Sequence, residues 1–163
     1  MKEKLSLDTM AKVLTGLVFA ILISIAYFML RDLNGDEIPL TAVVLVFGFF
    51  FITLGIAWGL HPVSYEIESD ALIIHRPFGD VKIEKKNIVN IESIDSAKLR
   101  FGVRLFASGG FFGYFGIYRS NSIGNYYRYT GHSKNLVMIE TDKKRYVISP
   151  DSDEFAKAVL SIS

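Results

Sequence analysis

Two apolar stretches decide the fold: Val13–Leu30, which reads VLTGLVFAILISIAYFML, and Leu40–Leu60, which reads LTAVVLVFGFFFITLGIAWGL. Neither stretch contains a charged residue. As α-helices they would be about 27 and 31 Å long, close to the hydrocarbon thickness of a bilayer. Each Leu, Ile, Val or Phe favours insertion by roughly 0.3–0.6 kcal/mol. We therefore expect two transmembrane helices, because too little chain remains to bury both in a soluble core.

The rest of the chain has the size of one small domain. Of the 163 residues, about 100 follow the hairpin, a typical single-domain length. The absence of cysteine excludes disulfides, thiolate metal sites and cysteine nucleophiles. The net charge of +1 argues against nucleic acid as a partner. We divide the chain into an anchor at residues 1–62 and a domain at residues 63–163.

Basic residues predict the orientation of the hairpin. Lys2, Lys4 and Lys12 precede the first stretch, and fourteen Lys or Arg residues follow Leu60, whereas the connector at 31–39 carries one. The positive-inside rule then places both ends in the cytoplasm and the connector outside. The first stretch is long for a signal peptide and no small-residue cleavage site follows it, so we expect an uncleaved span.

Three glycines of the second stretch point to helix packing. Gly48, Gly55 and Gly59 lie at i, i+7 and i+11, on one face of a helix. Small residues let helix backbones approach closely in a membrane. The face either packs the two spans of one chain together or forms a contact between two copies. Tyr27 and Trp58 lie near the ends of the stretches, as interfacial aromatic residues often do.

From Val63 the apolar period changes from helical to alternating, which predicts β-strands. A first group is expected to form an antiparallel meander, a second group follows a glycine-rich region, and a helix at about 151–161 closes the domain. Phe155, Ala158, Val159 and Ile162 form its apolar stripe. The predicted strands are 63–68, 71–76, 81–84 and about 88–94, then 126–130, 135–141 and 145–149.

The region between these groups carries the candidate binding residues. Lys98, Arg100 and Arg104 alternate with apolar residues, which predicts a strand or extended loop with one basic face. Beside an anionic leaflet each basic residue would contribute about 1 kcal/mol of attraction. The alternative is a solvated face.

Four glycines and five aromatic residues then alternate between Ala107 and Tyr118. Glycine permits bends and close backbone approach, and aromatic residues supply apolar surface. The stretch is either a kinked strand that fills the core or an exposed loop that meets lipid headgroups or a partner. The candidate contact residues are Phe111, Phe112, Tyr114 and Phe115.

No pattern in the sequence predicts an enzyme. His61, His75 and His132 lie in three different elements, without the spacing of a metal site. No phosphate-binding Walker loop and no Gly-x-Ser-x-Gly elbow is present. Asp151 and Asp153 fit the start of a helix. We therefore expect no catalytic residue, no metal ligand and no cofactor.

Residues 63–160 resemble the bacterial PH domain family. The resemblance rests on Gly110-Phe111-Phe112-Gly113-Tyr114-Phe115-Gly116, on the strand Leu136–Thr141, and on Tyr146-Val147-Ile148-Ser149-Pro150 before Glu154-Phe155. It implies a small, partly open antiparallel barrel, plugged by a C-terminal helix and used for binding. Phosphoinositide binding is not implied, because the first hairpin carries Glu66, Glu68 and Asp70 in place of a basic motif.

Together these observations predict a multi-pass protein of the bacterial cytoplasmic membrane that presents a PH-like β domain in the cytoplasm. The favoured function is a non-enzymatic binding or scaffold module for a protein partner or for self-assembly. The alternative is a sensor of anionic lipid headgroups that uses the basic face and the aromatic loop. No polar or ionisable path crosses either span, which argues against a transporter.

Overall fold

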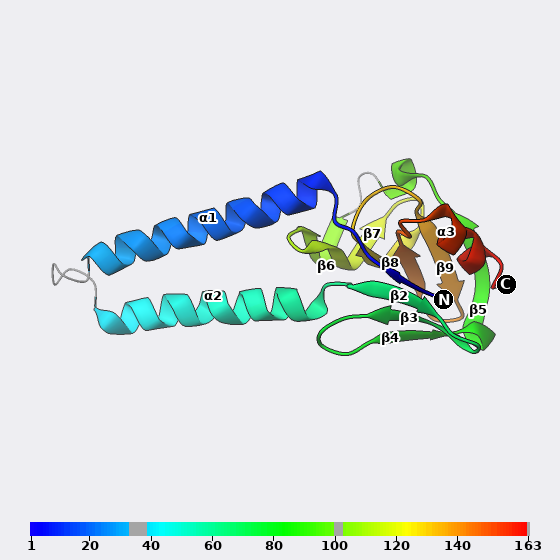
Figure 1. Cartoon of the computed structure of the whole chain (residues 1–163), viewed down its shortest axis with the longest axis horizontal. Helices are drawn as coiled ribbons and strands as arrows, with labels where there is room; N and C mark the ends of the chain where they lie inside the picture. The colour runs from blue at the N-terminus through cyan, green and yellow to red at the C-terminus, as the bar shows by residue number, and fades with distance from the viewer. Residues whose placement is uncertain (33–38, 100–102, 163) are drawn as a thin grey trace.

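A computed structural model describes residues 1–32, 39–99 and 103–162. Two long helices, α1 (Thr9–Asp32) and α2 (Leu40–Leu60), leave the same side of a β domain and run side by side (Figure 1). They confirm the two predicted apolar helices. Helix α1 begins before Val13 because Asp8 caps it: the Asp8 carboxylate accepts a hydrogen bond from the Ala11 N–H at 2.7 Å.

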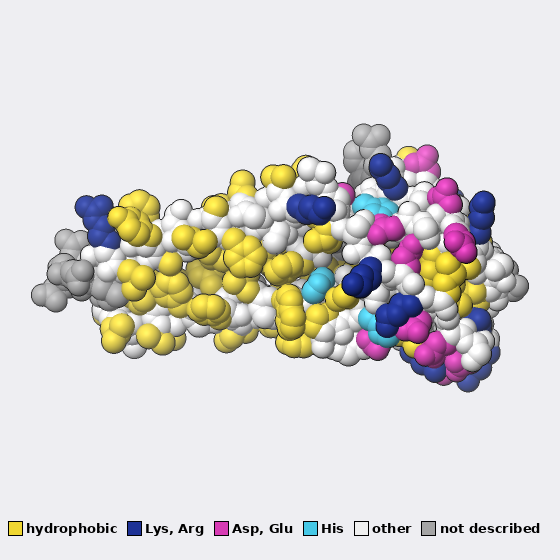
Figure 2. All heavy atoms as spheres, in the orientation of Figure 1, with side chains coloured by type: hydrophobic (Ala, Val, Ile, Leu, Met, Phe, Trp, Pro, Cys, Tyr) yellow, Lys and Arg dark blue, Asp and Glu magenta, His cyan; other side chains and the backbone are white. Residues whose placement is uncertain are grey.

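Both helices expose their apolar side chains. The most apolar window of α1 is 0% buried within the chain, and that of α2 is 6% buried. Charged side chains gather over the β domain and near the ends of the helices, while the middle of the helices is apolar or uncharged (Figure 2). Helices of a soluble core would be covered, so these two helices have the length and the surface of membrane spans.

The first sheet has the strand order β1-β2-β3-β4, and all its pairs are antiparallel. Strands β2 to β4 confirm the first three predicted strands. Strand β1 was not expected: its sequence Lys-Glu-Lys lacks apolar alternation, and it is a strand because Glu3 pairs with Tyr65 of β2. The strand bounds are Lys2–Lys4, Ser64–Ile67, Ala71–His75 and Val81–Glu84.

The second sheet has the order β5-β9-β10-β8-β7-β6. The predicted meander is wrong at its fourth strand, because β5 pairs with β9 instead of β4, and the β8–β10 pair is parallel. Within the described residues the two sheets do not join into a closed barrel. The bounds are Ile88–Ser93, Val103–Gly110, Gly113–Ser120, Gly124–Thr130, Val137–Thr141 and Arg145–Ile148 for β5 to β10, and Lys85–Asn87 and Ser96–Leu99 for the 3-10 helices η2 and η3.

The main core lies between the two sheets and is closed by helix α3 (Asp153–Leu160). Phe155 and Val159 of α3 are fully buried in it. Tyr65 links the sheets, since its hydroxyl donates to the Tyr129 carbonyl at 2.5 Å and accepts from the Ser149 N–H at 3.2 Å. Burial raises the pKa of Tyr65 above its usual value. The closing helix and the sheet-rich domain are therefore as predicted.

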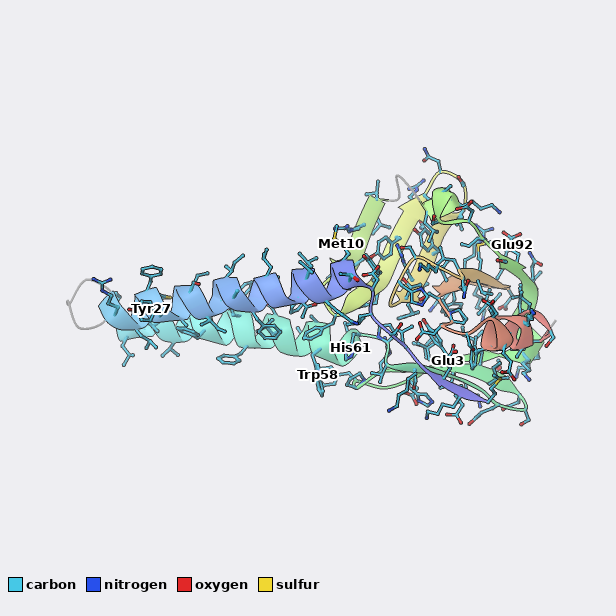
Figure 3. The ribbon with its side chains drawn as sticks, turned by 45° about the horizontal axis from the view of Figure 1, so that its top comes forward. Glu3, Met10, Tyr27, Trp58, His61 and Glu92 are labelled. Atoms are coloured by element: carbon cyan, nitrogen blue, oxygen red, sulfur yellow. The ribbon has the colours of Figure 1, made fainter. Side chains whose placement is uncertain are left out.

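One edge of the six-stranded sheet lies near the two long helices, and the other edge lies far from them. Strand β6 is the strand nearest to them and β5 is the farthest (Figures 1 and 3). Strand β6 is also an edge strand, paired only with β7 among the described residues. One unpaired sheet edge therefore faces the side from which α1 and α2 leave the domain.

Candidate functional site at the helix–domain junction

The N-terminal segment ties α1 to the β domain. The Glu3 carboxylate accepts hydrogen bonds from the backbone N–H groups of Asp151 (3.1 Å) and Ser152 (2.8 Å), just before α3. In return the Asp151 carboxylate accepts the Ser6 N–H (2.8 Å) and the Ser6 hydroxyl (2.7 Å). The predicted helix-start role of Asp151 is thus replaced by a role in holding the N-terminus, and Ser152 caps α3.

The loop between β8 and β9 forms the other wall of this attachment. His132 Nε2 lies 2.6 Å from Asp151 Oδ1, and the Asp8 N–H donates to the Gly131 carbonyl at 3.0 Å. A Cβ atom on Gly131 would overlap the Ser6 carbonyl oxygen, so only glycine lets the segment pass this close. We call this attachment the N-terminal latch; it comprises Glu3, Ser6, Asp8, Gly131, His132, Asp151 and Ser152.

The tip of the β6–β7 hairpin makes a second attachment. The Phe112 N–H donates to the Thr15 hydroxyl of α1 at 3.1 Å. The rings of Phe111 and Phe112 each lie 6.2 Å from the Phe19 ring, and Phe112 lies 5.6 Å from His61 at the end of α2. A positive φ of 55° at Phe112 makes this tight turn possible. Phe111 and Phe112 therefore join the hairpin tip to both helices.

The glycine–aromatic stretch divides between two roles. Phe115 is 6% exposed and lies in the main core, so the core-filling interpretation holds for this residue. Tyr114 points toward the junction: its hydroxyl donates to Asp8 at 3.3 Å, and its ring lies under the Arg128 guanidinium at 4.6 Å. The stretch is thus both a core strand and a junction, rather than one free loop.

The predicted basic face does not form along one strand. Lys98 lies on η3, where Asp95 accepts the Ala97 N–H at 2.9 Å and bends the chain, and Lys98 pairs with Glu92 at 3.3 Å. Arg104 lies on β6, with its guanidinium over Gly109 of the same strand. The expectation of a shared strand face is wrong for these two residues. Arg100 lies outside the described residues.

Strand β6 exposes apolar side chains at the edge nearest the helices. Val103, Leu105 and Phe106 are 62%, 53% and 73% exposed. An exposed apolar edge strand in water is a pairing and aggregation hazard, which proteins normally cover or charge. This edge therefore needs a cover that the described residues do not supply.

The glycine face of α2 is open along most of its length. A Cβ atom on Gly48 or Gly55 would meet nothing within 4 Å, so neither glycine packs α2 against α1. Gly59 is different, because the Phe78 ring covers it and the Phe78 N–H donates to its carbonyl at 2.8 Å. Trp58 packs edge-on against the same ring at 6.2 Å. The Gly48–Gly55 part of the face is left free for another helix.

The three histidines lie apart, and no group of three or more His, Asp or Glu within the described residues can hold a metal ion. His61 contacts the Trp58 carbonyl, His75 bridges Glu66 and Asp80, and His132 belongs to the latch.

Figure 3 places Trp58 and His61 at the domain end of α2, and Tyr27 at the far end of α1. The aromatic residues thus mark both ends of the apolar helices.

An ion pair holds β1 on β2. Glu66 lies 3.0 Å from the Lys2 ammonium and 2.8 Å from His75 Nε2. The hydrogen bond from His75 and then that from Lys2 hold the pKa of Glu66 below its usual value of 4.5. Because the folded-state pKa is lowered, this contribution is present above pH 4.5 and is lost as the pH falls through the folded-state value.

We therefore expect acid to loosen β1 through Glu66. Below the usual pKa of Glu66, wild-type protein should lose protection of the Ile67 amide, which donates to the Met1 carbonyl, and Glu66→Gln should show a flatter pH response. The measurement is amide hydrogen exchange across the acid range, with Glu154→Gln, an exposed carboxylate on α3, as the matched control. Equal pH profiles for wild type and Glu66→Gln would contradict this account.

A two-sheet β domain closed by a C-terminal helix defines a PH-like class of domain. The family model described as "Bacterial PH domain" matches residues 63–162, and the chain belongs to this family. Both long helices and β1 lie before the matched residues. No curated protein and no solved structure matches the chain.

The N-terminal latch was missed from the sequence. One signal was available: Asp8 stands five residues before Val13, where the first apolar stretch begins, and Asp is a common helix cap. Glu3 and Ser6 gave no such signal, because their partners lie about 145 residues later in the chain, at Asp151 and Ser152.

Proposed function

We propose that this chain is a non-enzymatic, membrane-anchored PH-like binding module that presents its β domain in a fixed orientation at the cytoplasmic face of the bacterial inner membrane. The observation that carries the proposal is the double attachment of the domain to its helices. The N-terminal latch holds the segment before α1, and the hairpin tip contacts α1 and the end of α2. A flexible linker would not need either contact.

The bilayer itself is the first partner of this module. With α1 and α2 inserted, β6 would lie at the level of the headgroups, and Val103, Leu105 and Phe106 would reach the interface. Lys12 at the base of α1 and Arg104 on β6 are exposed beside it, and each can attract anionic lipid by about 1 kcal/mol. This arrangement favours lipid contact over strand addition by a soluble protein at β6.

A fluorescent label at β6 tests the bilayer contact. The chain has no cysteine, so Val103→Cys gives a single site for an environment-sensitive dye. In nanodiscs we expect a blue-shifted emission that brominated lipids quench, because the dye enters the interface. Lys143→Cys, in the turn between β9 and β10, is the control and should show neither effect.

A further double variant makes this test decisive. Leu105→Asp combined with Phe106→Asp should remove the quenching of the Val103→Cys dye, because the edge no longer favours the interface. Emission from Val103→Cys as in water, insensitive to brominated lipid, would exclude bilayer contact at β6.

Self-association is the second candidate function, favoured by the open Gly48–Gly55 face. Helices that meet through small residues pack closely in a membrane, and no part of the described chain fills this face. We expect energy transfer between labelled copies in liposomes to fall in Gly48→Ile combined with Gly55→Ile. Gly16→Ile on α1, also with open space beside it, is the control. Unchanged transfer in the double variant would reject this interface.

A further inference from the structure

Arg128 is a buried cation on β8 without a carboxylate partner in the described part of the chain. It is 9% exposed. Its guanidinium lies over the rings of Tyr114 at 4.6 Å and Tyr118 at 5.8 Å. Its Nε donates to the Thr130 hydroxyl at 2.8 Å and its Nη2 to the Ser133 hydroxyl at 3.2 Å. All of these contacts are to neutral groups; the Asp8 carboxylate also acts electrostatically on Arg128, but among the described residues no ion pair joins the two within 4.0 Å.

This environment leaves hydrogen-bonding capacity of the guanidinium unused and gives its charge no carboxylate in direct contact among the described residues. A guanidinium has five N–H donors, and among the described residues only Thr130 and Ser133 accept from it. Burial lowers the pKa of Arg128 from its usual value, yet arginine stays protonated in proteins. Buried charges are normally paired, because desolvation of an isolated charge is costly. An anion is therefore the missing partner.

Arg128 lines a hollow of about 440 Å³ beside β8. The hollow lies between η3 and the β8–β9 loop, and polar and apolar groups line it. On the same face of β8, Tyr126, two residues before Arg128, has a buried hydroxyl without a hydrogen-bond partner among the described residues. The lining residues are Asp95, Ser96, Ala97, Leu99, Arg128 and Ser133.

We infer that this hollow is a binding site for a phosphate group, carried by a lipid headgroup or free in solution, with Arg128 as its main ligand. The planar fork of arginine suits a phosphate because two parallel N–H groups can donate to two oxygens. The hydroxyl of Ser133, which lines the same hollow, can donate to one of the remaining oxygens.

Asp95 limits the strength of the site. Its carboxylate lines the same hollow but accepts from the Ala97 N–H at 2.9 Å and the Ser96 hydroxyl at 3.2 Å. These bonds lower the pKa of Asp95, so it is charged at neutral pH and repels an anion. It forms no ion pair with Arg128 within 4.0 Å. The Asp95 carboxylate therefore weakens anion binding in the hollow, and loss of its charge should increase the affinity of the site for phosphate.

The site is separate from the bilayer contact proposed for β6. Strand β7 lies between β8 and β6, and none of the residues that line the hollow belongs to the exposed edge. Failure of one proposal therefore leaves the other standing.

The first experiment titrates inorganic phosphate into the full chain in an uncharged maltoside detergent and follows the thermal midpoint, with chloride at equal ionic strength as the reference. We expect phosphate to raise the midpoint of wild type, and Arg128→Met to bind about tenfold more weakly or not at all. Arg119→Met removes an exposed positive charge and is the control for net charge.

Asp95→Asn keeps the test decisive if Arg128→Met does not fold. We expect this variant to bind phosphate about threefold more tightly, because a repelling charge is gone. Asp142→Asn, an exposed acid in the β9–β10 turn, should leave the affinity unchanged. Lower stability of Asp95→Asn without tighter binding would mean that Asp95 is the counter-ion of Arg128, and would overturn the proposal.

A second arm separates the two sources of phosphate. The same proteins are placed in nanodiscs of phosphatidylcholine with or without phosphatidic acid. Stabilisation by phosphatidic acid that Arg128→Met abolishes assigns the site to a lipid headgroup, and a response to inorganic phosphate alone assigns it to a soluble ligand. No Arg128-dependent response in either arm would overturn the site.

Discussion

Phe155→Ala is expected to lower the free energy of unfolding of the β domain by about 3–5 kcal/mol. Phe155 is 0% exposed, and its ring lies 6.3 Å from that of Tyr65, between the two sheets. The two sheets do not close on each other within the described residues, so α3 covers the end of the core through this ring. Truncation would leave a cavity where both sheets and the helix meet.

The measurement is urea unfolding of the full chain in maltoside micelles, followed by near-ultraviolet circular dichroism of the tyrosines. Lys157→Ala on the exposed side of α3 is the control and should change the free energy of unfolding by less than about 0.5 kcal/mol. A cost below about 1 kcal/mol for Phe155→Ala would mean that α3 does not close the core.

Gly131→Ala is expected to open the N-terminal latch. It should lower the free energy of unfolding by about 2–4 kcal/mol, because overpacking and lost hydrogen bonds act together. A methyl group at this position would overlap the Ser6 carbonyl and press on Leu5, both in the segment before α1. The segment must move away, which breaks the bonds from Ser6 to Asp151. The β domain would then keep its core but lose one attachment to its helices.

Hydrogen exchange shows this opening directly. In Gly131→Ala the amide of Leu5, which donates to the Val63 carbonyl, should exchange faster, while the amide of Ile139, in the core of the second sheet, should exchange as in wild type. Gly16→Ala, with open space beside it, should change neither amide. Unchanged exchange at Leu5 in Gly131→Ala would contradict the latch.

Much of this fold could be predicted from short-range patterns of apolar residues. The two apolar stretches, the alternation in β2 to β4 and the apolar stripe of α3 each follow from the period of the apolar residues, and each formed as predicted. Family resemblance then supplied the domain type. In each of these elements, the period of the apolar residues within a short window of sequence shows which face is apolar.

Elements that depend on distant partners could not be predicted in this way. Strand β1 is polar and three residues long, and it exists because the edge of β2 was free to pair. The parallel β8–β10 pair and the β5–β9 pair join segments whose order no local pattern encodes. The predicted basic face failed for a local reason, since Asp95 starts a 3-10 helix at a place where alternation suggested a strand.

The candidate site shows the same division. The aromatic residues of the hairpin were identified from composition, but their contacts with α1 and α2 required the three-dimensional arrangement. Arg128 was not recognised as a buried cation because charged residues are almost never buried without a partner, and the two tyrosine rings under its guanidinium belong to another strand, β7. The aromatic residues of the hairpin could therefore be identified from the composition of a short stretch. Arg128 could not, because only its three-dimensional environment is unusual.

We infer that the β domain is held in one orientation relative to its helices. Spin labels at Ile23→Cys, exposed on α1, and at Lys143→Cys, in the β9–β10 turn, measure this by double electron–electron resonance in nanodiscs. We expect a single narrow distance distribution between the two labels. A broad or multiple distribution in the otherwise unchanged chain would show that the domain swings freely on its anchor and would contradict the claim.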